Sequence, residues 1–190
     1  FTFNKKTGKK ISAIIPVHVW GNAVKLKELI KICKKKNIKV IEDATESLGT
    51  FYTHKELKGK HTGTIGDLGC LSFNGNKIIT AGAGGAILTK SNLLAKKARY
   101  LISQSKDDKF KFIHNSLGYN YSLSNLNAAV GYSQMKKIKH IIKLKSKISF
   151  NYKKMLNKIQ GLDLNLSPTY ANNNRWLNIL IIVLAIWAYS

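Results

Sequence analysis

The sequence predicts an α/β fold, and a strand, an amphipathic helix and a second strand near its start are the observations that indicate it. Residues 11–21 (ISAIIPVHVWG) are apolar and β-branched and end in glycine, as expected for a buried strand that runs into a turn. Residues 26–36 repeat apolar side chains at helical spacing, and Asn37 stops the helix. Residues 39–44 (KVIEDA) form the second strand. Together they predict a βαβ unit, whose carboxyl strand ends are the usual ligand sites of α/β proteins.

The next segments continue the alternation of strands and helices. GCLSF (69–73) and GGAILT (84–89) predict two short strands, and residues 91–103 predict a helix that Ser91 opens as its N-cap. Residues 124–159 predict either one long helix or two abutting helices.

A proline and a cluster of asparagines in residues 161–174 mark the best candidate for a domain boundary. We therefore expect residues 1–160 to form a partial large domain. We expect residues 161–190 to form a linker and the truncated start of a small C-terminal domain.

Both ends of the chain are unusual. It starts at Phe1 without a methionine and enters a strand-like run almost at once, so we expect an N-terminal part to be missing. The apolar run 179–189 is shorter than the roughly 20 residues that span a bilayer. We interpret it as a buried strand separated from its sheet; a membrane anchor and frame-shifted coding remain alternatives.

The formal net charge of +23 on 190 residues suggests an anionic partner at first sight. Only Arg99 and Arg175 are arginine, however, and proteins that read bases or grip phosphates favour the bidentate guanidinium. The lysines are scattered along the chain, whereas a nucleic-acid footprint should cluster. We expect a solvated lysine-rich surface with no nucleic acid or membrane partner, and a basic anion-binding module remains the alternative.

The two cysteines, Cys33 and Cys70, form no CxxC pair and are interpreted as core residues of a protein in a reducing compartment, the cytoplasm. The histidines show no spacing typical of zinc ligands. We expect no metal.

One lysine, Lys77, has sequence neighbours that would suit a reactive amine. A lysine attacks carbonyl groups when its surroundings lower its pKa and hold it still. Gly75 precedes Lys77 and further glycines follow it, which allows a flat ligand to approach the backbone. Ser72 offers a hydroxyl to an anionic group, and Asp43, at a strand end, offers a carboxylate to a cation such as a protonated pyridine nitrogen. A solvated lysine and a helix-capping aspartate remain the plain alternatives.

Two phosphate-binding motifs do not fit this region. The glycines follow Lys77 and no serine or threonine adjoins it, so GxxxxGK[ST] is absent. The GAGGA run contains no GxGxxG that opens a helix, which excludes the dinucleotide fingerprint.

Four motifs in order resemble the DegT family of nucleotide-sugar aminotransferases, which are fold-type I pyridoxal-phosphate enzymes. They are PVHVWGN, VIEDATESLGT, GDLGCLSFNGNKIITAGAGGAILT and LGYNYSLSNLNAAVG. The resemblance covers residues 11–180 and implies a partial three-layer large domain of the aspartate aminotransferase-like type. Within the family the chain looks most similar to the branch that aminates 4-keto sugars for legionaminic-acid or perosamine-type glycans.

The resemblance implies a role for each matching residue. Lys77 would hold pyridoxal 5'-phosphate, Asp43 would face its pyridinium nitrogen and Ser72 would bind its phosphate. Asn120, in GYNYS, would reach the cofactor phosphate of a neighbouring subunit, so that a homodimer shares its sites. Glu46 stands where many members carry glutamine near the phenolic oxygen of the cofactor.

The implied reaction is a transamination with glutamate as the amino donor and a nucleotide-linked 4-keto sugar as the acceptor. Lys77, once freed, would move the proton as a general acid and base. Relatives with histidine at this position are dehydratases. For His18, in the first motif, we expect a packing or supporting role.

Three departures from the family pattern stand beside the resemblance. Members begin well before this chain, and that segment supplies a Gly-Thr phosphate-binding turn and an aromatic residue that stacks on the cofactor. Ser122 replaces the arginine that normally follows GYNY, and the two are not interchangeable against a carboxylate or phosphate. The tail after Leu180 also departs from the pattern. We therefore expect these 190 residues alone to be a poor enzyme, and an inactive remnant is the alternative.

Overall fold

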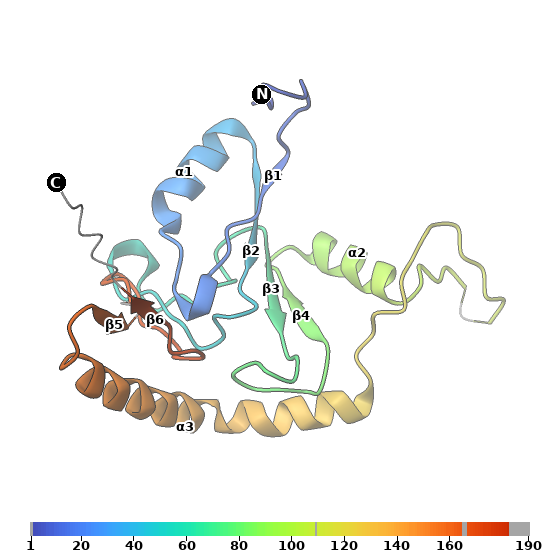
Figure 1. The fold of residues 1–190 in the computed structure, drawn as a ribbon. Helices are drawn as coiled ribbons and strands as arrows, with labels where there is room; N and C mark the ends of the chain where they lie inside the picture. Colours follow the sequence, from blue (N-terminus) through green and yellow to red (C-terminus); the bar gives the residue numbers. More distant parts are fainter. Residues whose placement is uncertain (1, 109, 165–166, 183–190) are drawn as a thin grey trace.

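The computed structural model describes residues 2–108, 110–164 and 167–182, and a four-stranded sheet forms its centre (Figure 1). The sheet has the order β1-β2-β3-β4. Its pairs β1–β2 and β2–β3 are parallel, and β4 is antiparallel to β3. The strands are β1 (Ala13–Ile14), β2 (Lys39–Asp43), β3 (Leu68–Ser72) and β4 (Gly85–Leu88). The predicted α/β class and the parallel βαβ unit are confirmed.

Three α-helices accompany the sheet: α1 (Leu26–Lys36), α2 (Asn92–Ile102) and α3 (Asn125–Leu156). Asn37 ends α1 in the left-handed conformation, with φ of 52°, and the Ser91 side chain caps α2 by accepting from Leu94 N, both as predicted. Residues 124–159 therefore contain one long helix rather than two. Short 3-10 helices occur at η1 (Val19–Gly21) and η2 (Lys55–Leu57).

The first strand differs from its prediction. Residues 11–21 do not form a buried strand: β1 has two exposed residues, and Ile15 beyond it is 60% exposed. β1 lies at the edge of the sheet, so one of its sides has no strand against it in the described part of the chain. Pro16 has no N–H to donate, and the chain then tightens into η1 with Trp20 at a φ of 55°. Apolar composition alone did not reveal this edge position.

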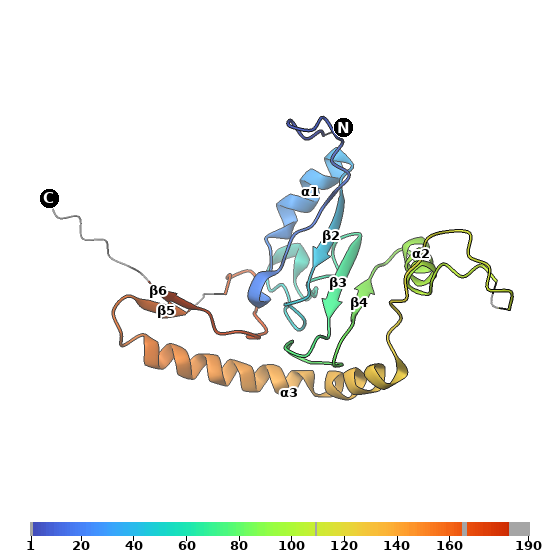
Figure 2. The same cartoon turned by 45° about the vertical axis from the view of Figure 1, so that its right-hand side comes forward.

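Helix α3 runs beneath the loop that joins β3 to β4, as both Figure 1 and Figure 2 show. A buried cluster connects the two: Leu48, Ile78, Ile79 and Trp176 pack against Ile138, Ile141 and Ile142 of α3. Gln134 Oε1 accepts a hydrogen bond from Thr80 N at 2.9 Å, and the Asn127 side chain donates to Ala81 O. The long helix therefore supports the loop that carries Lys77.

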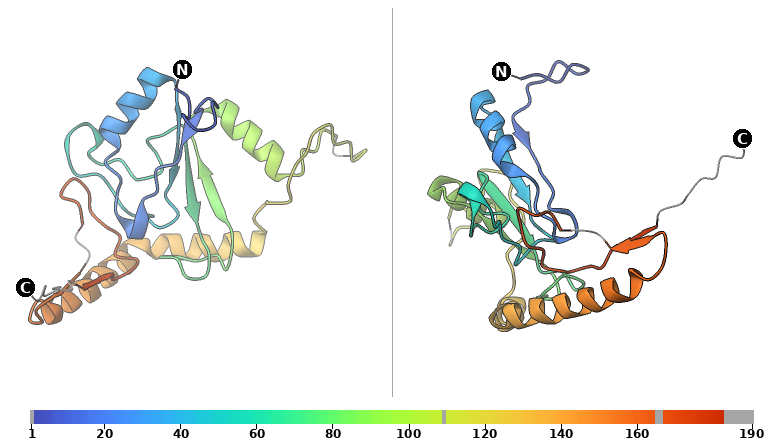
Figure 3. Two further views of the ribbon diagram at one scale, coloured as in Figure 1. Left: turned by 45° about the horizontal axis from the view of Figure 1, so that its top comes forward. Right: turned by 90° about the vertical axis from the view of Figure 1, so that its left-hand side faces the viewer.

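The segment between α2 and α3 leads away from the sheet (Figure 3). It carries exposed aromatic side chains. Phe110 is 91% exposed and Tyr121 is 73% exposed. Asn120 belongs to this segment, and its backbone forms an isolated antiparallel bridge with Ser103 at the end of α2.

The segment after α3 forms a small second sheet of β5 (Leu162–Leu164) and β6 (Leu180–Ile182). Between these strands Tyr170 stacks on Tyr52, and Asn174 is fully buried. The division at residue 160 stays a prediction. Only the beginning of the apolar run 179–189 is described, because residues 183–190 lie outside the described part of the chain. In the part that is described, no helix is long and apolar enough to cross a membrane.

Candidate active site

Asp43 ends β2, and both of its backbone polar groups are hydrogen-bonded to the neighbouring segment that follows β1. Its N–H donates to Pro16 O and its carbonyl accepts from His18 N, each at 2.9 Å. Oδ1 accepts from the backbone N (3.1 Å) and the hydroxyl (2.7 Å) of Thr45. Within the described residues Oδ2 accepts no hydrogen bond. The half-buried carboxylate thus keeps one oxygen for a cationic partner.

Ser72 lies at the same end of the sheet as Asp43, the carboxyl ends of the strands, because β2 and β3 are parallel. Asp43 pairs with Cys70 in the register, and Ser72 is the last residue of β3. Its half-buried hydroxyl accepts from Asn74 N at 3.3 Å, the first contact of the loop that follows.

Lys77 lies in that loop and its side chain is held from two directions. Its N–H donates to Asn74 O at 3.1 Å, which closes a turn. The side chain is only 14% exposed, and Nζ lies 3.8 Å from Glu46 Oε1. Nζ also lies 4.2 Å from the centroid of the Trp176 ring. A lysine with so little exposure and two defined neighbours is not the solvated surface lysine of the plain alternative.

Glu46 contacts both Lys77 and the backbone of η1. Its Oε2 accepts from Trp20 N at 2.7 Å, while Oε1 faces Lys77. Its carbonyl accepts from the buried Asn174 side chain at 2.8 Å. The carboxylate therefore has a fixed position between η1 and the lysine loop.

Trp176 is the residue at this site that the sequence analysis missed. It is 8% exposed, and its Nε1 donates to Asn76 O at 2.6 Å, next to Lys77 in the chain. The local sequence around Trp176 resembles a linker, and the two partners of this hydrogen bond are 100 residues apart. A single tryptophan directly after the polar run 172–175 is the only signal that could have indicated it.

Asn120 and Ser122 do not join the other site residues within this chain. Asn120 is exposed on the segment that leads away from the sheet, and no contact joins it to Lys77 among the described residues. The Ser122 hydroxyl donates to Ile102 O at 3.3 Å, which ties it to the end of α2. His18 is fully buried, as expected for a supporting role.

Among the described residues, no group of three or more histidine, cysteine, aspartate or glutamate side chains could hold a metal ion. Both cysteines are free, and burial raises the pKa of the thiols of Cys33 and Cys70.

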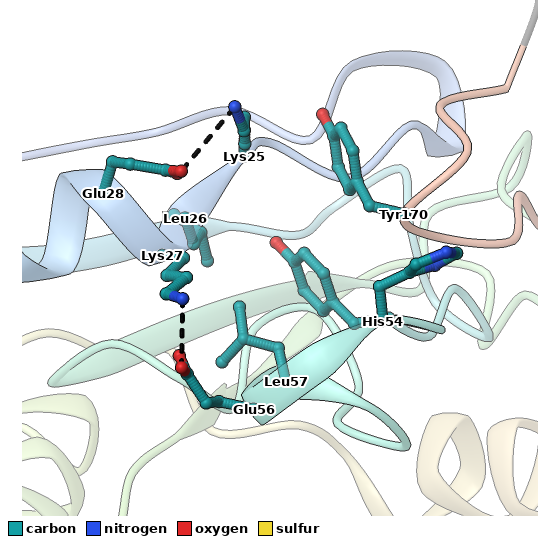
Figure 4. A pocket seen from close by; sticks show the side chains of 9 residues that line it. Lys25, Leu26, Lys27, Glu28, His54, Glu56, Leu57 and Tyr170 are labelled. Atoms are coloured by element: carbon teal, nitrogen blue, oxygen red, sulfur yellow. Dashed lines mark ion pairs between the residues drawn. The ribbon is translucent and has the colours of Figure 1, made fainter.

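A separate hollow of about 280 Å³ lies between α1 and η2 (Figure 4). Leu26, Leu57 and Tyr170 are among its lining residues, and two ion pairs, Lys25–Glu28 at 3.6 Å and Lys27–Glu56 at 3.0 Å, lie at it. None of the predicted site residues lines it.

The arrangement around Lys77 fits a flat, anionic cofactor with a basic ring nitrogen. It offers an amine with defined neighbours, a carboxylate with one free oxygen on Asp43 and a hydroxyl on Ser72 at the same edge. Gly82 and Gly84 in the loop have φ of 82° and 87°, which only glycine adopts without strain, and a Cβ at Gly84 would lie 2.6 Å from Leu123 Cδ1.

A comparison with solved structures shows the fold. The aminotransferase TlmJ from Streptoalloteichus hindustanus has the same fold, with a TM-score of 0.82 at 22% identity over 90% of this chain and 46% of that one. The chain therefore has the predicted α/β fold, which matches part of that structure.

The sequence comparison then defines the family. Residues 3–185 match the DegT/DnrJ/EryC1/StrS aminotransferase family, and the chain belongs to it. EpsN of Bacillus subtilis (strain 168) is 38% identical over 93% of this chain and 44% of its own length. GDP-perosamine synthase of Escherichia coli O157:H7 is 34% identical over 82% of this chain and 41% of its own length. The chain thus spans less than half the length of these curated relatives.

Proposed function

We propose that the protein transfers an amino group to a nucleotide-linked 4-keto sugar with pyridoxal 5'-phosphate as cofactor and glutamate as donor. The observation that carries the proposal is the contact between Lys77 and Glu46, which follows Asp43 at the carboxyl end of β2. Membership of an aminotransferase family supports the reaction class. EpsN carries a provisional name as a pyridoxal phosphate-dependent aminotransferase, which supports the cofactor. The second relative is named GDP-perosamine synthase, which supports a nucleotide-linked sugar as the acceptor.

Each residue has a proposed task that follows from its contacts. Lys77 holds the cofactor and, once released, carries a proton as the general base and acid. Asp43 would face the ring nitrogen with its free Oδ2, Ser72 would donate its hydroxyl to the phosphate, and Glu46 would lie against the Lys77 amine. When bound, the cofactor supplies an electron sink that stabilises a carbanion at the carbon losing its proton.

The test is whether Lys77 carries the cofactor. Pyridoxal phosphate and borohydride should fix a pyridoxyl group to the peptide that contains Lys77. Lys77→Ala should lose this label, and turnover should fall by about 10²- to 10⁴-fold from the loss of proton transfer alone. Lys90→Ala is the matched control, because Lys90 is an exposed lysine close in the sequence. Labelling spread evenly over many lysines would reject the proposed function.

We further propose that the active form is a homodimer in which Asn120 completes the site of the other copy. Its exposure on a segment that leads away from the sheet supports this arrangement. Lys77→Ala and Asn120→Ala should each be inactive alone. Mixing and refolding them together should restore part of the activity, because one site in each mixed dimer then carries neither change. A mixture as inactive as its components would show that Asn120 does not act across a dimer.

A further inference from the structure

A buried carboxylate lies directly beside Asp43 in the sequence and takes part in none of the contacts described above. Glu42 is fully buried, and each of its oxygens accepts two hydrogen bonds. Oε2 accepts from His18 Nε2 at 3.0 Å and from Gly63 N at 2.8 Å. Oε1 accepts from the N–H groups of Ile65 and Gly66, each at 2.6 Å. Four donors offset the cost of burying this charge, so Glu42 has a single well-defined position.

The ring of His18 has an equally defined orientation. Its Nδ1 lies 3.0 Å from Val24 N, a backbone group that can only donate, so Nδ1 accepts. The proton of the neutral ring is therefore on Nε2, which donates to Glu42. Both ring nitrogens are satisfied, and neither ring flip nor the other tautomer would preserve both bonds.

These side chains close a ring of contacts around Asp43. The His18 side chain binds the Glu42 side chain, Glu42 is joined to Asp43 by a peptide bond, and Asp43 O accepts from His18 N. Because successive side chains of a strand point to opposite faces, Glu42 fixes β2 from the face opposite to the Asp43 carboxylate. The Asp43 peptide can thus neither rotate nor shift along the strand without breaking the buried His18–Glu42 bond.

We propose that His18 and Glu42 are positioning residues that hold the Asp43 carboxylate in its direction, through the hydrogen bond from His18 Nε2 to Glu42. A pair of apolar side chains could fill the same volume, but it would not oppose a small rotation of the strand end, whereas directional bonds do. The consequence for catalysis rests on the proposed function, since it requires a ring nitrogen opposite Asp43. The positioning itself does not.

Amide hydrogen exchange measured by NMR without cofactor tests the positioning directly. In His18→Leu the Asp43 amide, which donates to Pro16 O, should exchange about tenfold faster or more, the size expected for loss of one hydrogen bond to a charged group. His18→Gln keeps a donor and an acceptor and should return the rate close to that of the unchanged protein. Ser105→Ala removes a different buried hydrogen bond, to Leu117 O, and should leave the Asp43 amide unaffected.

The amides of β4 report general loosening of the fold. If exchange at the β4 amides increases as much as exchange at the Asp43 amide in His18→Leu, His18 stabilises the fold in general and the proposal is wrong. If His18→Leu does not fold, the ¹⁵N shifts of His18 in the unchanged protein decide, and protonation on Nδ1 would overturn the proposal.

A cofactor measurement separates this inference from the proposed function. In the protein loaded with pyridoxal phosphate, His18→Leu should weaken cofactor binding and shift its visible absorbance band, and Ser105→Ala should do neither. If the unchanged protein binds no cofactor, the proposed function fails, while the exchange rates still decide whether His18 positions Asp43.

Discussion

Nζ of Lys77 lies 4.2 Å from the centroid of the Trp176 ring, and the same ring donates through Nε1 to Asn76 O. One aromatic side chain therefore holds both the ammonium group and the backbone of the loop that carries it. Contacts between a cation and an aromatic face contribute roughly 0.5 to 2 kcal/mol, depending on how far water is excluded.

Replacing Trp176 should destabilise the protein, and the loss should be smaller when the substitute keeps an aromatic ring. Trp176→Ala should lower the free energy of unfolding by about 3–5 kcal/mol, because it leaves a cavity among Leu48, Ile78 and Ile79. Trp176→Phe retains a ring near Lys77 and loses the bond to Asn76, at a cost of about 1 kcal/mol plus some packing. Urea denaturation measures both. Trp20→Ala is the control, because Trp20 is 41% exposed; equal losses for the two alanine variants would contradict this account.

His61 should make the protein less stable as the pH falls through the weakly acidic range. Burial lowers the pKa of His61, and its Nε2 accepts from Gly49 N at 2.7 Å, a bond that protonation of Nε2 would break. The folded state therefore binds fewer protons than the unfolded state. The stabilisation is full above the unfolded pKa of about 6.5 and decreases below it, by at most about 1.4 kcal/mol per pH unit.

Urea denaturation at a series of pH values checks the His61 prediction. His61→Gln should flatten the dependence below about pH 6.5. His54→Gln, a change at an exposed histidine, should leave it intact. If His61→Gln retained the full slope, another group would be responsible.

Glu42 should make the stability of the protein depend on pH in a more acidic range than His61 does. Burial raises the pKa of its carboxyl, but hydrogen bonds from His18 and from the backbone of Gly63, Ile65 and Gly66 outweigh burial, so the pKa is lowered overall. Its contribution to stability is complete above the unfolded pKa of about 4.3 and is lost as the pH falls towards the lowered folded value.

The variant Glu42→Gln should be less stable by about 1–3 kcal/mol at neutral pH, since an amide cannot accept from four donors. It should also lose the steep decrease in stability below about pH 4.3. Acid titration followed by circular dichroism measures this decrease. Glu28→Gln, at an exposed position of α1, serves as the control, and an acid profile of Glu42→Gln identical to that of the unchanged protein would refute the prediction.

Gly69→Ala should prevent the sheet from forming correctly. A Cβ at Gly69 would lie 1.9 Å from Gly63 O, a backbone atom that cannot move aside without disturbing the Glu42 contacts. Gly75→Ala is the matched control, because a Cβ there meets nothing within 4 Å. We expect soluble, folded protein only from the second variant, judged by expression and circular dichroism. Equal yields and equal unfolding temperatures would show that the fold tolerates the clash.

The regular elements could be predicted from the sequence because their signals are local. The stripe of apolar residues and Asn37 define α1, and Ser91 caps α2 through its own side chain. The extent of β1 could not be predicted, because an edge strand and a buried strand can share the same apolar composition and differ only in their neighbours. The apolar pattern of residues 124–159 is compatible with one helix or two, and the structure shows one, α3.

The candidate site could be predicted only in part. Two predicted residues, Asp43 and Ser72, end the neighbouring strands β2 and β3, and Lys77 in the loop after β3 contacts Glu46. The roles of these residues stay predictions. The contacts that give Lys77 its position come from Trp176 and from the bond between Trp20 N and Glu46. Neither follows a periodicity, because both depend on how distant segments meet after folding.

The contact between Trp176 and the Lys77 loop also sets an order of events during synthesis. A ribosome releases the lysine loop well before the tryptophan, with the whole of α3 between them in the chain. Until Trp176 emerges, Lys77 has neither the aromatic ring over its ammonium group nor the hydrogen bond that fixes the carbonyl beside it. The nascent chain therefore completes its lysine site late, when the segment after α3 folds back onto the sheet.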